Sequence, residues 1–561
     1  MNIIELYSVL FIGLLAGCPT LKLIFHSSRA SRYVAVAFER FIWYPLVLRG
    51  GYWASVTRFE LLLFFAFLAC NIFALVFRVS GVRNLEQRAA VVCAINMTSL
   101  FLSGKPNPLI ELIGVPLPVY HLVHHWIGRV AILEGLLHAA LTIGRSGSSQ
   151  LQASGCIVAI SMSTISITSI WVVRRYSYRL FLLIHTGAVL ASLGGMFWHV
   201  LFQHRSVSRI PAFVGGSLWV LSLIFWIVRV CFATPGVIQT RRQEKGAVYI
   251  QVSCTRPVRV FPGCYFFIFL PGRLFRYDLT SSFPMLVMWH SLASVSGTNK
   301  DVGFLMSDRG RMSRISRLDI GNSLRLDGPY GRNLELWNYE TVILTAKGMG
   351  IAGVLSSALS LIDRRNQDWE VKKNKQSAER LFRDLTRKVA IVWTLEFNAQ
   401  EDWAASAFSV LKGLDLDQKF FAVWCIYPSE QNKKTPFTET DLWKTFYSKR
   451  NKESSFLDAM VKQDTRSPGR SVVVACGDPE FTNAARQSAI KHSRGDSRIH
   501  FMESDYRPSN HGRRKVSGLR LQEEGNVEKE GSKRVQRRSA VKATKLTTEA
   551  TRTESNERGA L

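Results

Sequence analysis

The chain has 561 residues, 47% of them hydrophobic, and its 71 Lys and Arg against 42 Asp and Glu give a net charge of +29. This length exceeds what one hydrophobic core supports and predicts two or three domains. The basic residues lie in loops beside apolar spans and in the tail, which indicates contact with anionic lipid rather than nucleic acid. Nine cysteines without CxxC spacing argue against a disulfide framework and a zinc site.

Seven apolar segments before about residue 234 predict membrane-spanning helices, the third short enough to be re-entrant. They cover residues 3–25, 59–80, 88–104, 119–143, 154–173, 179–203 and 210–233. The first lacks a cleavable signal pattern and is predicted to be an anchor. Basic loops at 26–58 and 174–179 belong in the cytosol by the positive-inside rule. We therefore expect the N-terminus outside and everything after residue 234 in the cytosol.

Two of these segments each carry a pair of histidines fourteen residues apart, His124 with His138 and His185 with His199. Fourteen helical residues return to within about 40° of their starting direction and rise about 21 Å. Ionisable groups at membrane depth mark functional sites, and neutral imidazole is a good axial ligand for haem iron. We predict an inner pair, His124 with His185, and an outer pair, His138 with His199, each holding one haem. The alternative for any single histidine is an interhelical hydrogen bond.

Other polar residues of these helices lie off the two ligand faces. Helical register turns His121, His125 and His204 about 100–140° away, which predicts interfacial polar residues. Arg129 and Glu134 share a helix with the first histidines. We expect Arg129 to meet a haem propionate, and the alternative is an ion pair within or between helices.

After residue 234 the pattern changes to short β-rich runs and helical stretches. Runs predicting a small antiparallel barrel lie at 246–253, 264–272 and 323–331. Residues 341–355 read as strand, glycine turn and helix, the geometry that places a pyrophosphate at a helix N-terminus. Further buried strands predicting a doubly wound sheet lie at 389–395, 419–427 and 471–479.

Two charged segments complete the chain. The run from Asp363 to Lys388 is expected to be a solvated helical insertion. Beyond Tyr506 there is no Phe, Trp or Tyr, and residues 512–561 hold 13 Lys and Arg against 7 Asp and Glu. This composition predicts a disordered basic tail that contacts the inner leaflet.

Several motifs together resemble those of fungal ferric-chelate reductases, within the wider ferric reductase and NADPH oxidase superfamily, over about residues 58–506. HHWIGRVAILEGLLHA (124–139) resembles that family's His-x-Trp-x-Gly-Arg signature, and RRYSYRLFLLIH (174–185) resembles the segment that leads into the second ligand helix. Signatures resembling those that bind nucleotide are DGPYG (327–331), KGMGI (347–351) and ACGDP (475–479).

The resemblance implies a multidomain chain: an α-helical transmembrane bundle of about seven helices, an antiparallel β-barrel flavin domain and an α/β doubly wound nucleotide-binding domain. The implied parts are an anchor and loop (1–58), a haem domain (59–234), an FAD barrel (235–333), an NAD(P) domain (334–506) and the tail (507–561). The implied NADP contacts are Gly328, Pro329, Tyr330, Gly331, Gly348, Gly350, Cys476 and Gly477.

The flavin motif departs from the family pattern, which begins His-Pro-Phe and continues with Thr or Ser. This chain reads FPMLVMW at 283–289. The FAD contacts that the resemblance implies are Phe283, Pro284, Met285, Leu286 and Tyr506, the last as cover of the flavin ring. Lys347 also replaces a usual glycine, and its cation either favours a phosphate or crowds the backbone approach.

Electron counting sets the expected order of cofactors. A nicotinamide gives two electrons as hydride and a haem takes one, so a flavin is needed between them. The resemblance implies NADPH, FAD and two b-type haems, and reduction of ferric chelates, siderophores or cupric ion outside the plasma membrane, with an iron permease or oxidase as candidate partner. An NADPH oxidase-like superoxide producer and a non-catalytic haem membrane protein with a degenerate flavin site stay open as alternatives.

Overall fold

The computed structural model describes a discontinuous set of segments. These are residues 3–11, 13, 34, 37–48, 56–100, 117–144, 148–176, 178–202, 209–271, 277–290, 298–307, 318–331, 333–373, 381–428, 436–448, 453–464, 469–493 and 499–504. Most of the first predicted span, Tyr506 and the basic tail lie outside the described residues.

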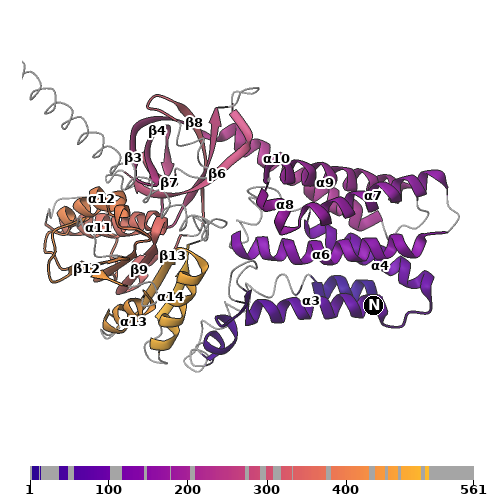
Figure 1. Cartoon of the computed structure of the whole chain (residues 1–561), viewed down its shortest axis with the longest axis horizontal. Coiled ribbons are helices and arrows are strands. Elements are labelled where there is room, and N and C mark those ends of the chain that lie inside the picture. The colour runs from indigo at the N-terminus through magenta and orange to yellow at the C-terminus, as the bar shows by residue number, and fades with distance from the viewer. Residues whose placement is uncertain are drawn as a thin grey trace, which may run out of the picture. The chain divides into compact units, whose positions relative to one another are not determined.

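Long helices make up most of the described residues between 58 and 232 (Figure 1). They are α3 (Arg58–Val76), α4 (Val82–Leu100), α6 (Leu117–Thr142), α7 (Ser149–Thr168), the short α8 (Trp171–Tyr176), α9 (Tyr178–Leu201) and α10 (Arg209–Phe232). The six long ones coincide with the six spans predicted after residue 58. Within the described segments, α3, α7, α9 and α10 are long and apolar enough to cross a membrane.

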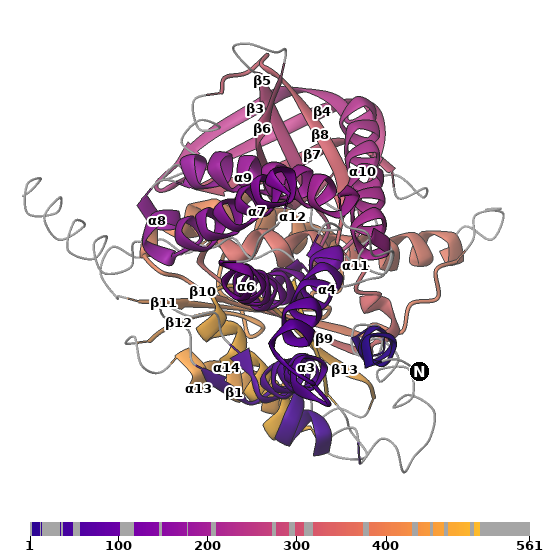
Figure 2. The ribbon, with the colours of Figure 1, turned by 90° about the vertical axis from the view of Figure 1, so that its right-hand side faces the viewer.

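Local chemistry explains where these helices begin and how they pack. Thr57 and Glu60 form a reciprocal capping box, in which each side chain accepts the other's backbone N–H, and this starts α3. The view along the helices shows α4 beside α6 and α7 beside α9 (Figure 2). A Cβ on Gly195 of α9 would lie 3.0 Å from side-chain atoms of Ile157 and Val158 of α7. The missing side chain lets the two helices approach closely.

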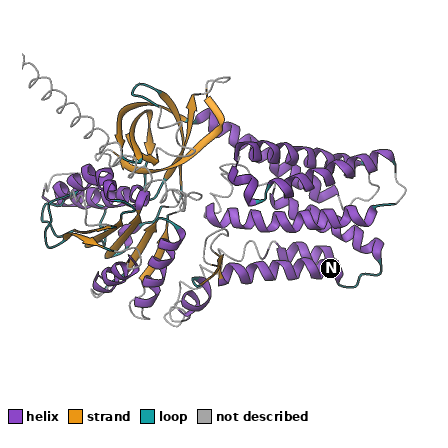
Figure 3. Cartoon of the chain, viewed as in Figure 1, coloured by secondary structure: helices purple, strands orange, loops and turns teal. Residues whose placement is uncertain are grey.

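Before α3, a one-turn π-helix, η1 (Glu39–Trp43), precedes a two-stranded sheet of β1 (Leu46–Leu48) and β2 (Val56–Thr57). After α10 the chain turns at once into strands (Figure 3). They are β3 (Thr234–Glu244), β4 (Ala247–Arg259), β5 (Tyr265–Pro271), β6 (Tyr277–His290), β7 (Thr298–Ser307) and β8 (Ser323–Tyr330).

The strands β3 to β8 close into an antiparallel barrel in the order β3-β4-β7-β6-β5-β8. Alternating residues such as Val248, Ile250 and Val252 point inward and fill it. The three predicted runs correspond to β4, β5 and β8. The sequence did not predict β3, whose outer residues are largely polar, or β6 and β7.

The last region is a parallel sheet of six strands in the order β12-β11-β10-β9-β13-β14. The strands are β9 (Thr341–Lys347), β10 (Lys388–Thr394), β11 (Phe421–Tyr427), β12 (Trp443–Tyr447), β13 (Ser471–Cys476) and β14 (Ile499–Glu503). One face is covered by α11 (Ile351–Lys373) and α12 (Glu401–Leu414), the other by α13 (Glu453–Asp464) and α14 (Pro479–His492). Short 3-10 turns are η3 (Leu336–Asn338), η4 (Gly348–Gly350) and η5 (Asn398–Gln400). This is a doubly wound sheet, although β12 and β14 were not predicted.

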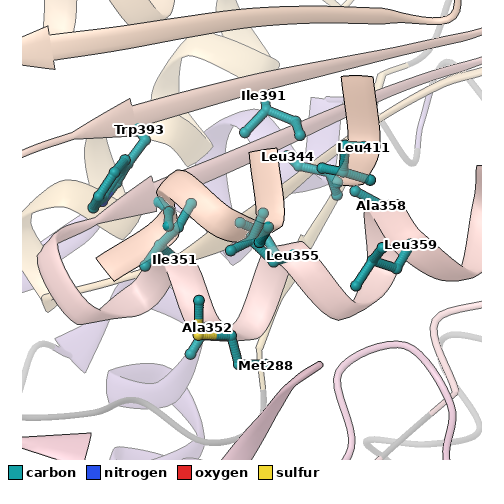
Figure 4. Packing of buried hydrophobic residues seen from close by; sticks show 14 of the residues in the cluster. Met288, Leu344, Ile351, Ala352, Leu355, Ala358, Leu359, Ile391, Trp393 and Leu411 are labelled. Atoms are coloured by element: carbon teal, nitrogen blue, oxygen red, sulfur yellow. The ribbon is translucent and has the colours of Figure 1, made fainter. Parts of the chain in front are cut away.

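Helix α11 joins the sheet to the barrel. Ile351 and Leu355 of α11 pack among Leu344 and other buried residues of the sheet, while Met288 of β6 lies beside Ala352 (Figure 4). Burial of each large apolar side chain contributes about 1.5–3 kcal/mol. The strand that carries the flavin motif thus packs on the helix that follows the glycine turn.

The charged run at 363–388 is not one solvated helical insertion, so this prediction was wrong. Helix α11 continues to Lys373, but the described residues 381–387 are not helical. The buried Asp368 carboxylate accepts the backbone N–H groups of Phe382 and Arg383 at 2.6 and 2.7 Å. Charge-assisted hydrogen bonds of this kind replace the hydration that the composition suggested.

Candidate functional site

The four predicted ligand histidines meet in two pairs between α6 and α9. Ring centroids are 6.5 Å apart for the inner pair, His124 and His185, and 6.3 Å apart for the outer pair, His138 and His199. A metal ion held at about 2 Å by one nitrogen of each facing ring would separate the two centroids by about 6 Å. Both spacings therefore suit one iron between two imidazoles.

The outer pair is oriented by neighbouring helices. His138 Nδ1 lies 3.1 Å from the carbonyl oxygen of Glu86 in α4. His199 Nδ1 lies 3.2 Å from the carbonyl of Leu151 and 3.2 Å from Ser154 Oγ in α7. A ring nitrogen that faces a carbonyl carries the proton, which leaves Nε2 with its lone pair for a metal. Both outer rings therefore have the tautomer that a ligand requires.

The inner pair has no such support within the described residues. The Nδ1 atoms of His124 and His185 are buried and have no hydrogen-bond partner there. The ring of Phe181 lies 5.3 Å from that of His185 between centroids. An unpartnered buried nitrogen costs about 1–3 kcal/mol. Two imidazoles that face each other are a donor set that fits haem iron, but no partner among the described residues fixes the tautomer of the inner rings.

Arg129 and Glu134 do not pair with each other in the described part of the chain. The Arg129 guanidinium lies 5.2 Å from the centroid of Trp126. Glu134 is buried and accepts a hydrogen bond from Asn96 Nδ2 at 2.8 Å. The expected contact of Arg129 with a haem propionate stays a prediction.

The histidines that the sequence analysis excluded as ligands belong to neither facing pair, although the ring centroid of His125 lies 6.1 Å from that of His124. His121 and His125 are exposed, and His125 Nε2 is 3.5 Å from Arg174 Nη1. His204 lies outside the described residues.

A buried polar chain that the sequence analysis missed runs through the helices near the outer pair. The Tyr7 hydroxyl lies 2.8 Å from Asn71 Oδ1 and 2.5 Å from Asn96 Oδ1. Asn96 Nδ2 donates to Asn71 Oδ1 and to Glu134 Oε2, each at 2.8 Å. The available signal was asparagine inside two apolar spans, since buried amides need partners.

The predicted nucleotide residues Gly348, Gly350, Cys476 and Gly477 gather at the carboxyl edge of the parallel sheet. Ala346 of β9 pairs with Cys476 of β13, so the turns that follow these strands are adjacent. A Cβ on Gly350 would lie 2.0 Å from the carbonyl oxygen of Cys476, so only glycine fits there. The strand order reverses between β9 and β13, and such switch points bind ligands in open α/β sheets.

The Lys347 side chain points toward the turn that follows β13. Its Nζ lies 3.6 Å from Asp478 Oδ2. Asp478 also caps α14 by accepting the backbone N–H of Phe481 at 2.9 Å. The cation is therefore held beside the edge by an ion pair and does not crowd the glycine turn.

The predicted contacts Gly328 to Gly331 lie at the end of β8, where Tyr330 is only 1% exposed. The Tyr330 hydroxyl donates to Asp327 Oδ2 at 2.6 Å. Because this side chain is buried, only the backbone of Tyr330 could contact a nucleotide.

The same residues join the barrel to α10. Arg229 Nε donates to Asp327 Oδ1 at 3.2 Å, and its guanidinium lies 4.1 Å from the centroid of Tyr330. In return, Arg325 Nη1 of β8 donates to the carbonyl of Val230 at 3.2 Å. We call this set of contacts the arginine junction. Arg229 was not among the predicted site residues, because only the fold brings the last turn of α10 against β8.

The altered flavin motif lies in β6, where Phe283 to Leu286 pair with Tyr265 to Ile268 of β5. The Met285 side chain is enclosed in the barrel core, so this residue is open to a flavin only through its backbone. The side chains of Phe283, Pro284 and Leu286, and all of Tyr506, lie outside the described residues.

Comparisons with known proteins agree with the motifs. Residues 88–196 match the family model described as ferric reductase like transmembrane component. Ferric/cupric reductase transmembrane component 2 of Saccharomyces cerevisiae is 25% identical over 305 residues, 51% of this chain and 41% of that protein. Probable cell surface ferric reductase kap2 of Aspergillus oryzae is 21% identical over 418 residues, 69% of this chain and 52% of that protein. The chain thus spans about half the length of these relatives or less.

Solved structures with some likeness include a ferredoxin NADP+ reductase from Neisseria gonorrhoeae with bound FAD and NADP. It is 13% identical, with a TM-score of 0.33, over 48% of this chain and 98% of that chain. At this level the likeness adds nothing to the topology described above.

Proposed function

The chain is a relative of the fungal ferric reductases and a membrane protein, and on this premise we propose that it is a transmembrane metalloreductase. It moves electrons from a cytosolic reduced nicotinamide nucleotide to ferric chelates or cupric ion outside. The resemblance found in the motifs is confirmed by the matches to the ferric reductase family model and to fungal ferric and cupric reductases. The activity itself is our proposal.

The observation that carries the proposal is the pair of facing imidazole pairs on α6 and α9. His124 with His185 and His138 with His199 would hold two b-type haems through ring nitrogens. Bound haem would supply one-electron carriage across the membrane. The chain's own contribution is to fix the rings: the carbonyls of Glu86 and Leu151 hold the outer imidazoles in the ligand tautomer.

The barrel is proposed as the FAD domain (235–333) and the doubly wound sheet as the NAD(P) domain (334–506). Their proposed cofactor contacts are the residues that the family resemblance implies. Bound FAD would supply the exchange between a two-electron donor and one-electron acceptors. NADPH is the donor implied by resemblance. NADPH and NADH share the nicotinamide and pyrophosphate, so the glycine turn at Gly348 to Gly350 suits both.

We further propose residence in the plasma membrane with the N-terminus outside and the reductase domains in the cytosol. The basic loops support this orientation. An inside-negative potential favours outward electron flow by roughly 2.3 kcal/mol per 100 mV. Ferric chelates or siderophores and copper are the proposed acceptors, and an iron permease or oxidase the proposed partner.

The test is a reduced-minus-oxidised spectrum of the purified chain beside His138→Ala and His185→Ala, together with ferric-chelate reduction. Each variant is expected to lose a different haem, about half of the Soret signal, and nearly all reduction. His121→Ala is the matched control, since this exposed histidine lies off both pairs and should change neither signal. A wild-type protein without Soret absorbance after expression with ample haem would overturn the proposal.

Two outcomes would favour the alternatives. Superoxide formation from oxygen alone, at rates that match iron reduction, would indicate an oxidase. A protein that retains haem but neither keeps nor regains FAD would indicate a non-catalytic haem protein with a degenerate flavin site.

A further inference from the structure

Glu396 lies over the glycine turn at the carboxyl edge of the parallel sheet. Strand β10 ends at Thr394, which pairs with Lys347 at the end of β9. A Cβ placed on Gly348 would lie 3.0 Å from Cδ, 3.0 Å from Oε2 and 3.2 Å from Cγ of Glu396. These are the three nearest atoms, so the Glu396 carboxylate covers this part of the turn.

The contacts around Glu396 hold its backbone while leaving the side chain open to solvent. Its backbone N–H donates to Oε1 of the buried Gln400 at 2.7 Å. Trp393 Nε1 donates to the carbonyl of Gly348 at 3.0 Å, which joins the end of β10 to the same turn. The Glu396 side chain is exposed. The carboxylate is therefore an accessible hydrogen-bond acceptor, on an anchored backbone, at the edge where a nucleotide would enter.

An acid at this place has a definite chemistry. In a doubly wound sheet the pyrophosphate lies at the glycine turn and the helix N-terminus, and the adenosine ribose reaches the end of the second strand. A carboxylate there accepts the free 2′-hydroxyl of NADH, whereas the 2′-phosphate of NADPH needs a cation. Carboxylate and phosphate repel each other at short range.

The segment that follows β10 does not itself supply such a cation. Between residues 395 and 411 the sequence contains Glu396, Glu401 and Asp402 and no Lys, Arg or His. Lys347 is directed to Asp478, on the β13 side of the turn. Burial first, and then Cys425 and Glu401, raise the pKa of Tyr427 at the end of β11, so this hydroxyl stays neutral. The segment that follows β10 therefore carries only acidic charges.

We propose that Glu396 selects the electron donor and that the nucleotide site of this chain prefers NADH to NADPH. The inference deepens the proposed function and rests on it, since it concerns the same nucleotide site. It differs from the donor that the resemblance implied, because resemblance identifies the glycine turn but not the charge that faces the ribose.

The test compares the full-length, FAD-loaded wild type with Glu396→Gln and Glu396→Arg. Flavin reduction by NADH and NADPH is followed by stopped flow, and binding of NAD+ and NADP+ by calorimetry. The wild type is expected to favour NADH by about tenfold or more, Glu396→Gln to lose about tenfold of this selectivity, and Glu396→Arg to invert it. The two readouts should change together, since the effect is on binding.

Glu370→Gln is the matched control. It removes the same charge from an exposed position on α11, about 28 Å along the helix from Ile351 and well beyond the Debye length. A wild type that prefers NADPH, or a selectivity that Glu396→Gln changes no more than Glu370→Gln does, would overturn the inference and leave the reductase function standing. If neither nucleotide reduces the flavin, the proposed function fails and this inference fails with it.

Discussion

The inner and outer histidine pairs have nearly the same ring separation, 6.5 and 6.3 Å, but different surroundings. Both outer Nδ1 atoms face backbone carbonyls of neighbouring helices, whereas both inner Nδ1 atoms lack a partner within the described residues. The difference teaches that equal spacing in sequence does not make equal sites. The packing of α4 and α7 preorients the outer rings, whereas the inner rings depend on the group that they bind.

The strongest test of this comparison is removal and return of haem. Ligand histidines whose second nitrogen is held by a partner bind metal about 10–100-fold more tightly. We therefore expect haem added back to extracted protein to fill the outer site first. His185→Ala and His199→Ala, each reconstituted alone, assign the two affinities by Soret titration. Equal affinities, or a tighter inner site, would contradict the role of the carbonyls.

The arginine junction tests the electron path at the end of the helices where α10 meets the barrel. Asp327→Asn removes the charge that Arg229 binds while keeping the shape, and a hydrogen bond to a charged group is worth about 1.5–3 kcal/mol. We expect several-fold slower haem reduction by the nucleotide, with an unchanged Soret band and unchanged flavin reduction. Stopped-flow absorbance separates these rates. The exposed Asp319→Asn is the control, and a loss of haem in Asp327→Asn would show that the junction supports the helices instead.

The buried polar chain of Tyr7, Asn71, Asn96 and Glu134 tests what supports the outer histidine pair. Glu134→Ala leaves Asn96 Nδ2 without this acceptor, and a buried unsatisfied donor costs about 1–3 kcal/mol. We expect lower thermal stability, with the outer haem lost before the inner one. Glu134→Gln keeps an acceptor oxygen and should lose less. A uniform loss of both haems would show that the chain does not favour the outer site.

The smallest effect is expected from Ser154→Ala. Ser154 Oγ and the carbonyl of Leu151 both lie 3.2 Å from His199 Nδ1, so the carbonyl remains when the hydroxyl is removed. A hydrogen bond of this kind contributes about 0.5–1.5 kcal/mol, which predicts less than a tenfold change in outer haem affinity. A larger loss would mean that Ser154, and not the backbone, orients the ring.

The sequence by itself determined the helical spans, the histidine faces and the glycine turn, because these depend on period and on local backbone chemistry. Fourteen-residue spacing places both histidines of a helix on one face wherever that helix lies. Likewise, continuous apolar runs predicted β9, β10, β11 and β13, which are buried on both faces of the sheet. The shorter or more polar β3, β12 and β14 carried a weaker pattern.

Only the tertiary structure decided which groups contact and orient these residues. The carbonyl of Glu86 meets His138, Asn96 meets Glu134, and Arg229 meets Asp327 across separations of 38 to 98 residues. Glu396 covers Gly348 because parallel strands end side by side. The periodicity of a sequence predicts one helix or strand at a time. The hydrogen bonds and charges that set the tautomer of a histidine ring, or the preference for one nucleotide, come from other elements that pack against it. Tertiary packing decides which elements those are.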